Sequence, residues 1–207
     1  MRNEERRERL RAALLDAAER TIAEHGLPAL KARDLAREVG CALGAIYTVF
    51  PDLDALILAV NLRTLALFDR AIAAVRVAPE PAGAATPAER DAAVDTLVRL
   101  AVAYLHFAAT HPARWRALFQ HRVTDALPDW YLVEQVRLFR TIEAPLQVLC
   151  PDLAEAERAL LARSLFSATH GLVSLGLDEK LMVLSEPVLR GQIETVVGAL
   201  GRGLAAG

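Results

Sequence analysis

Apolar residues recur every three or four positions along most of this 207-residue chain, and that spacing limits it to a helical fold. The first apolar stripe, within residues 8–25, consists of Leu14, Leu15, Ala18 and Ile22. No segment shows the sustained alternation that a strand requires. Glycines and prolines separate many of the stripes, although Pro145 lies inside one and predicts a kink or break near Thr141. The sequence therefore predicts an all-α protein of about nine helices.

Composition and charge exclude several classes of protein. Hydrophobic residues make up 54% of the chain and charged residues 24%, which predicts a folded core rather than a disordered segment. The net charge is −2, so a nucleic-acid partner requires a local basic surface. Cys41 and Cys150 are too few and too far apart for a disulfide framework or a metal site. The charged N-terminus and the short apolar runs predict a cytoplasmic protein.

The patterns that carry catalysis are not found in the sequence. Residues 171–176 miss the spacing of a nucleophile elbow by one residue, and no predicted strand precedes them. His106, His111 and His121 lack the spacing of metal ligands, and no glycine-rich phosphate loop follows a strand. We therefore predict no catalytic residues, no metal site and no cofactor, and we do not expect an enzyme.

The most informative local pattern lies between Lys31 and Leu56. Its apolar residues fit the inner faces of two short helices, and they are Leu35, Ala36, Val39, Ile46 and Phe50. Gly40 stands between the two helices, where a tight corner favours a residue without a side chain. Such a unit can place its second helix in the major groove of DNA. An ordinary helical corner has the same spacing, so the spacing alone leaves both readings open.

The residues from about Arg9 to Leu56 also resemble the DNA-binding domain of the TetR family of transcriptional regulators. The resemblance lies in Gly26, Leu35-Ala36, Gly40-Cys41-Ala42, Ile46-Tyr47, Phe50 and Asp54-Ala55-Leu56. It implies that Tyr47 contacts a phosphate and that the neighbouring residues of the second helix face the groove. The predicted DNA-binding residues are Arg33, Ala42, Leu43, Gly44, Ala45, Tyr47 and Thr48.

Three residues depart from the family pattern. Lys31 stands where the family usually has Ser or Thr, and lysine cannot supply the helix cap that those side chains give. Ala42 stands where Ser is frequent, and Leu53 stands where a lysine usually contacts the DNA backbone. These departures bear on the strength of DNA binding rather than on the fold.

The predicted recognition surface also has few groups that read bases. Residues 42–48 include no Arg, Asn or Gln for paired hydrogen bonds to a base, but they offer apolar contacts to thymine methyls and the Thr48 hydroxyl. Guanine recognition would have to come from Arg33, Arg37 or the arginine-rich N-terminus. The alternative to a DNA-binding regulator is therefore a helical ligand-binding dimer with weak or lost DNA binding.

Two later segments, residues 111–119 and 166–172, resemble the WHG-type ligand-binding domain of some TetR regulators, with Phe166 in place of the usual Trp. Aromatic residues are only 5% of the chain, yet nearly all lie outside the predicted DNA-binding part. A helical cavity lined by rings suits a small molecule, although core packing explains any single ring. The predicted pocket residues are Phe68, Tyr104, Phe107, Trp115, Phe119, Trp130, Phe139, Glu143, Phe166 and His170.

The last two predicted helices carry apolar residues at steps of four and three, a spacing that suits helix pairing. Two such helices from each of two chains would form a four-helix dimer interface, as the family implies. Packing within one chain explains the same spacing. The predicted interface residues are Leu161, Leu165, Ala168, Leu172, Leu175, Leu189, Ile193, Val196 and Leu200.

These predictions divide the chain into a helix-turn-helix DNA-binding domain over residues 1–52 and a ligand-binding and dimerisation domain over residues 53–207. The resemblance implies a homodimeric transcriptional regulator that binds double-stranded operator DNA. Its expected mode of action is that of a repressor released from the operator by a small hydrophobic effector. A change in the arrangement of the two N-terminal domains would then weaken DNA binding.

Overall fold

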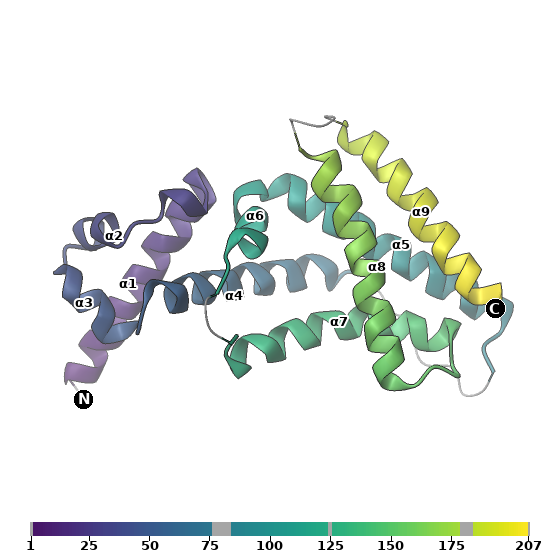
Figure 1. Ribbon diagram of the computed structural model, residues 1–207, viewed down its shortest axis with the longest axis horizontal. Coiled ribbons are helices and arrows are strands. Elements are labelled where there is room, and N and C mark those ends of the chain that lie inside the picture. The colour runs from purple at the N-terminus through teal and green to yellow at the C-terminus, as the bar shows by residue number, and fades with distance from the viewer. Residues whose placement is uncertain (1, 76–83, 124–125, 179–183, 207) are drawn as a thin grey trace. The chain divides into compact units, whose positions relative to one another are not determined.

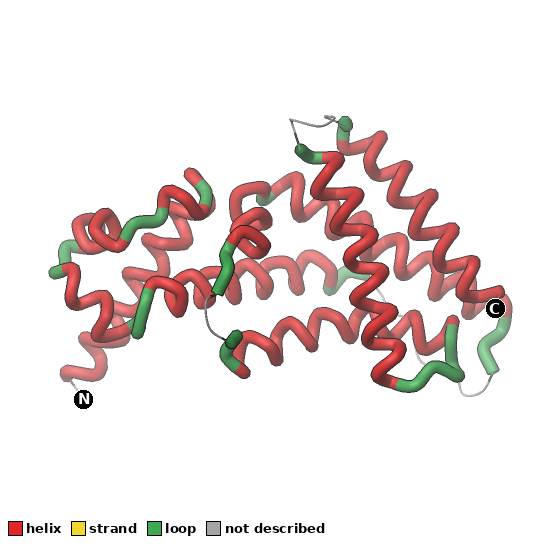
Figure 2. Tube along the Cα trace, in the orientation of Figure 1, coloured by secondary structure: helices red, strands yellow, loops and turns green. Residues whose placement is uncertain are grey.

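The computed structural model describes residues 2–75, 84–123, 126–178 and 184–206, and within these ranges it contains helices and no strand (Figures 1 and 2). The elements in chain order are α1 (Arg2–His25), the short 3₁₀ helix η1 (Leu27–Ala29), α2 (Ala32–Val39), α3 (Leu43–Val49), α4 (Leu53–Ile72), α5 (Pro87–Thr110), α6 (Pro112–Gln120), α7 (Asp129–Leu149), α8 (Glu155–Gly176) and α9 (Glu186–Ala206). The predicted all-α class and the N-terminal helix-turn-helix are confirmed.

The chain folds into two compact units. Unit 1 consists of Met1–Leu67 and His111–Leu132, and unit 2 consists of Phe68–Thr110 and Val133–Gly207. Helix α6, from the middle of the chain, therefore packs with the N-terminal helices. The predicted functional boundary at residue 52 falls just before α4, whereas the packing keeps the first part of α4 in unit 1.

Unit 1 has a continuous apolar core. The predicted stripe of α1 is buried, with Leu14 and Ile22 fully inaccessible. It packs in one cluster with apolar residues from the other unit 1 helices, including Leu35, Ile46, Phe50, Leu56, Val60 and Ala117. Each fully buried side chain of this size contributes roughly 1.5–3 kcal/mol. Burial of one face each of α2 and α3 thus fixes the helix-turn-helix on α1.

The turns of unit 1 depend on two glycines and one aspartate. Gly26 ends α1 with a φ of 78°, and Gly40 ends α2 in the left-handed region with a φ of 75°. The backbone N–H of Cys41 then donates to the Ala36 carbonyl at 2.9 Å. At the start of α4, Asp52 Oδ1 accepts a hydrogen bond from the Ala55 backbone N–H at 2.6 Å. By contrast, the Lys31 side chain makes no capping hydrogen bond to α2.

Unit 2 is built around α5, along which α9 packs (Figure 1). Thr86 and Glu89 cap the start of α5 reciprocally: the Thr86 backbone N–H donates to Glu89 Oε2 at 2.7 Å, and the Glu89 N–H donates to Thr86 Oγ1 at 3.3 Å. By length and composition α5 is the one described helix that could cross a membrane alone. However, 56% of its apolar window is buried inside the protein, which is typical of a core helix.

Two expectations are corrected in unit 2. Helix α7 continues through Pro145 to Leu149, so the predicted break near Thr141 does not occur. In α9, Leu189 and Ile193 are 1% and 0% exposed, so they pack inside the chain rather than on a surface open to a second copy. Leu189 lies directly on α8, because a Cβ added to Gly176 would lie only 2.7 Å from Leu189 Cδ1. Gly176 therefore permits close packing of α8 and α9 within one chain.

Candidate nucleic-acid interface and effector site

Helix α3 has one face in the core and one face in solvent. Ile46 and Val49 are buried, whereas Leu43 and Tyr47 are 39% and 48% exposed. The remaining predicted groove-facing residues are Ala42, Gly44 and Thr48, which are exposed, and Ala45, which is half-buried. The packing of unit 1 thus leaves the predicted recognition surface accessible.

The polar groups on this surface are few. The Thr48 hydroxyl donates to the Ala45 carbonyl at 2.7 Å and keeps its oxygen as an acceptor. Arg33, in the first turn of α2, is exposed, whereas Arg37 pairs with Asp34 at 3.1 Å on the same helix. Leu53 packs partly buried against the core of unit 1. The exposed side chains of α3 itself thus include the Tyr47 phenol and the Thr48 hydroxyl but no Arg, Asn or Gln for paired readout of bases.

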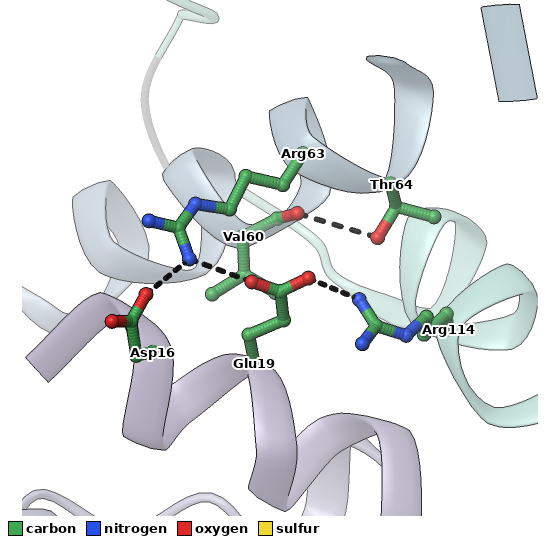
Figure 3. Close-up of polar contacts among 6 residues, drawn as sticks. All are labelled: Asp16, Glu19, Val60, Arg63, Thr64 and Arg114. Carbon is green, nitrogen blue, oxygen red and sulfur yellow. Dashed lines mark hydrogen bonds and ion pairs between the residues drawn. The ribbon is translucent and has the colours of Figure 1, made fainter. Parts of the chain in front are cut away.

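A cluster of charged side chains joins three helices of unit 1. Arg63 Nη1 of α4 donates to Asp16 Oδ1 and to Glu19 Oε2 of α1, each at 2.6 Å. Arg114 Nη1 of α6 donates to the other carboxylate oxygen of Glu19. Figure 3 shows the two arginines reaching Glu19 from different helices. We call Asp16, Glu19, Arg63 and Arg114 the Glu19 cluster.

The Glu19 cluster favours an ionised carboxylate. Partial burial by itself would raise the pKa of Glu19, but hydrogen bonds and charges from Arg114 and Arg63 outweigh it and hold the pKa below its ordinary value. The Glu19 and Arg114 side chains are only 23% and 21% exposed, so water screens this pair less than a surface pair. Such a cluster fixes the relative positions of the helices that carry it.

Two further polar contacts join helices of unit 1. His121, which follows α6 and has a side chain 7% exposed, bonds through Nε2 to Asp54 Oδ1 in the first turn of α4, at 2.9 Å. Arg20 of α1 donates to Glu38 Oε1 of α2 at 2.7 Å. Together with the Glu19 cluster, they connect α1 to α2, α4 and α6, and α4 to α6.

Six of the predicted pocket residues come together in unit 2. Phe68 contacts the rings of Tyr104 and Phe107, with centroids 5.6 and 5.1 Å apart. Phe166 lies 5.4 Å from Tyr104 and 5.5 Å from Phe139, and it stacks on His170 at 5.8 Å. We call these six residues the aromatic cluster. Its side chains come from α4, α5, α7 and α8.

The aromatic cluster contains one polar pair. Tyr104 Oη and His170 Nδ1 are 2.7 Å apart, and the two side chains belong to α5 and α8. Burial lowers the pKa of His170 below its ordinary value of 6.5, because desolvation favours the neutral ring. The tautomer of His170 decides which of the two groups donates this hydrogen bond, because a phenol hydroxyl and a neutral imidazole nitrogen can each donate or accept. The cluster is therefore an apolar environment with a neutral hydrogen-bonding pair.

The other predicted pocket residues lie elsewhere. Trp115 and Phe119 contact each other in unit 1, at 5.8 Å, and Trp115 is buried whereas Phe119 is 44% exposed. Trp130 lies against Tyr131 and is 45% exposed. Glu143, on α7 in unit 2, is half-buried. The predicted set thus divides between the two units, and the aromatic cluster is the part that the structure assembles.

Apolar side chains remain exposed on α8 and α9. Leu175 is 58% exposed and Leu200 is 42% exposed. Of the other predicted interface residues, Ala168 is exposed, whereas Leu161, Leu165, Leu172 and Val196 are half-buried. Gly171 and Gly191 face open space, because an added Cβ on either would meet no atom within 4 Å. These exposed positions remain open to a second copy of the chain.

Sequence patterns did not predict the Glu19 cluster. Arginines are so frequent in this chain that the sequence does not single out any one of them as a functional residue. Asp16 and Glu19 lie three residues apart on α1 and so share a face, which is a local signal. Their partners, however, lie 44 to 95 residues further along the chain, and only the topology brings them together.

Within the described ranges, no group of three or more His, Cys, Asp or Glu could hold a metal ion.

A helix-turn-helix with one exposed helix face, followed by a second helical unit with an aromatic cluster, is the arrangement expected of a DNA-binding transcription regulator. Residues 14–60 match the family "Bacterial regulatory proteins, tetR family", and residues 97–196 match "Tetracyclin repressor-like, C-terminal domain". The chain belongs to the TetR family of transcriptional regulators, with a DNA-binding domain and a C-terminal ligand-binding domain. Proteins of this family are transcription factors and not enzymes. The WHG-type resemblance is narrower than these matches and stays a prediction.

Solved structures share the fold. A protein of unknown function from Rhodococcus sp. RHA1 is 23% identical, covers 95% of each chain and has a TM-score of 0.65. A TetR-like transcriptional regulator from the same organism is 18% identical, covers 97% of each chain and has a TM-score of 0.59. A TetR variant from Acinetobacter baumannii AYE, in complex with minocycline, is 18% identical over 93% of this chain and 94% of its own, with a TM-score of 0.57. No curated protein sequence matches the chain.

Proposed function

We propose that this TetR-family regulator is a cytoplasmic homodimeric repressor that a small hydrophobic effector releases from its operator DNA. The observation that carries the proposal is the exposure of Leu43, Tyr47 and neighbouring residues on α3, a surface that the core of unit 1 does not use. An apolar and aromatic helix face left in solvent, on a helix of this position, is suited to the major groove.

In this proposal the contacts to DNA divide by role. Tyr47 and Arg33 contact phosphates and position the protein, and such contacts carry no sequence information. Ala42, Leu43 and Ala45 contact thymine methyl groups, and Thr48 offers its hydroxyl to a base edge. The functional boundary near residue 52 then separates the DNA-contacting helices from the domain that binds the effector and the second chain.

The proposed effector site is the aromatic cluster with the half-buried Glu143. Rings from four helices give apolar walls, and the Tyr104–His170 pair gives an oriented polar group. A ligand that separates these helices would bind one arrangement of the protein more tightly than another. That difference in affinity sets the upper limit of its effect on DNA binding, and such couplings are on the order of 1–3 kcal/mol.

The proposed dimer forms through the exposed positions of α8 and α9. Leu172, Leu175, Val196 and Leu200 lie in its centre, while Leu189 and Ile193 support the surface from within. The open positions Gly171 and Gly191 permit close approach of a second helix. Two chains would present two recognition helices to successive turns of the major groove.

The test uses the purified chain and a duplex from the region upstream of its gene. Fluorescence anisotropy gives the affinity, light scattering gives the mass, and a thermal-shift screen of aromatic and hydrophobic compounds finds ligands. The proposal predicts a mass of twice 22.5 kDa. It also predicts that a ligand at 100 times its dissociation constant stabilises the fold by about 2.7 kcal/mol and weakens DNA binding.

A second function is favoured by the surface of α3 and by Leu53. The recognition surface offers no side chain for paired base readout, and Leu53 packs on the core where a lysine would reach a phosphate. A ligand-binding dimer with weak DNA binding would show ligand stabilisation and a dimer mass, but only salt-sensitive, sequence-independent binding of duplex DNA.

A further inference from the structure

The carboxylate of Glu19 receives hydrogen bonds from arginines of two different helices. Oε2 accepts from Arg63 of α4 at 2.6 Å, and Oε1 accepts from Arg114 of α6. Arg63 is also held by Asp16, one turn earlier on α1. Both oxygens of one side chain therefore fix α4 and α6 on α1 (Figure 3).

These two helices lie where the chain passes between the units. The chain leaves unit 1 after Leu67, within α4, and returns at His111, directly before α6. Arg63 lies four residues before the first crossing, and Arg114 lies three residues after the second. Glu19 thus links the end of the unit 1 part of α4 and the start of α6 to α1. The buried stripe of α1 in turn supports the helix-turn-helix.

Contacts in the middle and at the end of α6 also define its position. Trp115 and Ala117 are 4% and 1% exposed, and Ala117 packs in the core cluster of unit 1. His121, just after the helix, bonds to Asp54 of α4. Helix α6 is therefore held at its start by Glu19, in its middle by apolar contacts and at its end by Asp54.

We infer that Glu19 is a positioning residue for DNA binding, because its bridge to Arg63 and Arg114 holds α4 and α6 on α1 in the arrangement that binds DNA. The inference rests on the proposed function and adds a residue that touches neither DNA nor effector. A movement of α6 that separates Arg114 from Glu19 removes the ion pair of this part-buried arginine, and a movement of α4 that separates Arg63 from Glu19 leaves Arg63 with Asp16 alone. The bridge therefore favours one position of these helices over its alternatives.

The sign of the charge effect makes the inference testable. Glu19→Gln keeps the shape of the side chain and removes one negative charge. By electrostatics alone, this loss should tighten binding to polyanionic DNA. The inference predicts the opposite, an affinity lower by about tenfold at fixed salt. Glu24→Gln is the matched control, because Glu24 lies on the same helix, is 65% exposed and pairs with its neighbour His25.

The experiment measures anisotropy with duplex DNA from the region upstream of the gene and hydrogen exchange of the α6 amides. The samples are the wild type, Glu19→Gln, Arg114→Gln and Glu24→Gln, each checked by thermal unfolding. We expect weaker DNA binding and faster exchange over residues 112–120 for the first two variants, and unchanged exchange with equal or tighter binding for Glu24→Gln. If Glu19→Gln does not fold, the exchange of the α6 amides in Arg114→Gln decides, because this variant leaves the Arg63 bridge intact and its lost positive charge would by itself weaken DNA binding.

Three results would overturn the inference. Equal or tighter DNA binding by Glu19→Gln would refute it while leaving the proposed function in place, as would unchanged exchange of α6. Equal weakening by Glu24→Gln would refute it too, because the effect would then not depend on the bridge. A wild-type protein that binds no duplex DNA would overturn the proposed function and the inference together.

Discussion

The helices within each of the two units are held by different kinds of interaction. In unit 1, charged side chains join helices that lie far apart in the sequence, and the Glu19 cluster is its most enclosed example. In unit 2, α4, α5, α7 and α8 meet through aromatic rings, and α8 meets α9 where Leu189 packs on Gly176. In the described part of unit 2, the ion pair between Arg137 of α7 and Asp69 of α4 is more exposed, with side chains 52% and 31% exposed.

This difference suits the two proposed tasks. Hydrogen-bonded charges are directional, so they define one position for α6 and α4 on α1. Ring contacts and aliphatic packing tolerate several arrangements of similar volume. A DNA-binding unit needs its recognition helix in one place, whereas an effector site must accept a ligand. The substitutions below test whether the two units respond as these interactions predict.

The largest effect is expected from a charge in the core of unit 2. Ile193→Asp places a carboxylate at a position that is fully buried within the chain. An unpaired charge of this kind destabilises the fold by several kcal/mol, comparable with the stability of many domains. Calorimetry of the variant should show either no unfolding transition or a transition at a much lower temperature. A stable monomer with a normal melting temperature would show that Ile193 belongs to the dimer interface after all.

A charge on the exposed face of α8 should act on assembly instead. Leu175 is 58% exposed in the single chain, so Leu175→Asp leaves the fold of unit 2 intact. If this face pairs two chains, the buried charge would weaken the dimer by about 3–5 kcal/mol. Light scattering should then show the variant at 22.5 kDa and the wild type at twice that mass. A dimeric variant would place the interface elsewhere.

The Glu19 cluster should give unit 1 a dependence on acid. Because the pKa of Glu19 is lower in the folded chain than its ordinary value of 4.5, its contribution to stability is present above that value. It is lost as the pH falls through the folded pKa. Glu19→Gln should therefore cost about 1–3 kcal/mol of unfolding free energy near neutral pH and less in acid. Denaturant unfolding at several pH values measures the difference, and a constant difference would contradict the assignment.

A smaller effect is expected from the polar pair of the aromatic cluster. Tyr104→Phe removes the hydrogen bond to His170 Nδ1 and keeps the ring contacts with Phe68 and Phe166. The loss should be about 0.5–1.5 kcal/mol in thermal unfolding. Any effector found by screening should bind more weakly if it uses this pair. Phe107→Leu is a control, because it changes a ring of the cluster without changing the polar pair.

The sequence predicted the elements whose signals are local. The apolar spacing predicted the helices, and Gly40 predicted the turn between α2 and α3, because left-handed backbone favours glycine. The break at Pro145 was wrong, since α7 continues through the proline. Heptad spacing in α9 predicted a pairing seam, but spacing does not say which partner covers it. Leu189 and Ile193 are covered by the same chain.

The candidate site was predictable in part for the same reason. Tyr47 and its neighbours follow from a continuous motif, and the aromatic cluster follows from the position of scarce rings. The Glu19 cluster depends on arginines brought close by the fold, and α6 joins unit 1 across more than forty residues of intervening chain. No pattern within one helix indicates such a contact.

The most direct test of the central proposal is DNA binding by the wild type and Tyr47→Phe. Anisotropy is measured at about 50 mM and about 200 mM salt with a duplex from the region upstream of the gene and with a scrambled duplex of equal length. If the protein is a DNA-binding regulator in which Tyr47 contacts a phosphate, the wild type binds tightly and in a salt-sensitive way. Its affinity is higher for the upstream duplex than for the scrambled one. The phosphate contact predicts that Tyr47→Phe weakens binding to both duplexes by the same factor. Binding that is absent in the wild type, or unchanged by Tyr47→Phe and by a second variant, Thr48→Glu, would contradict the proposal.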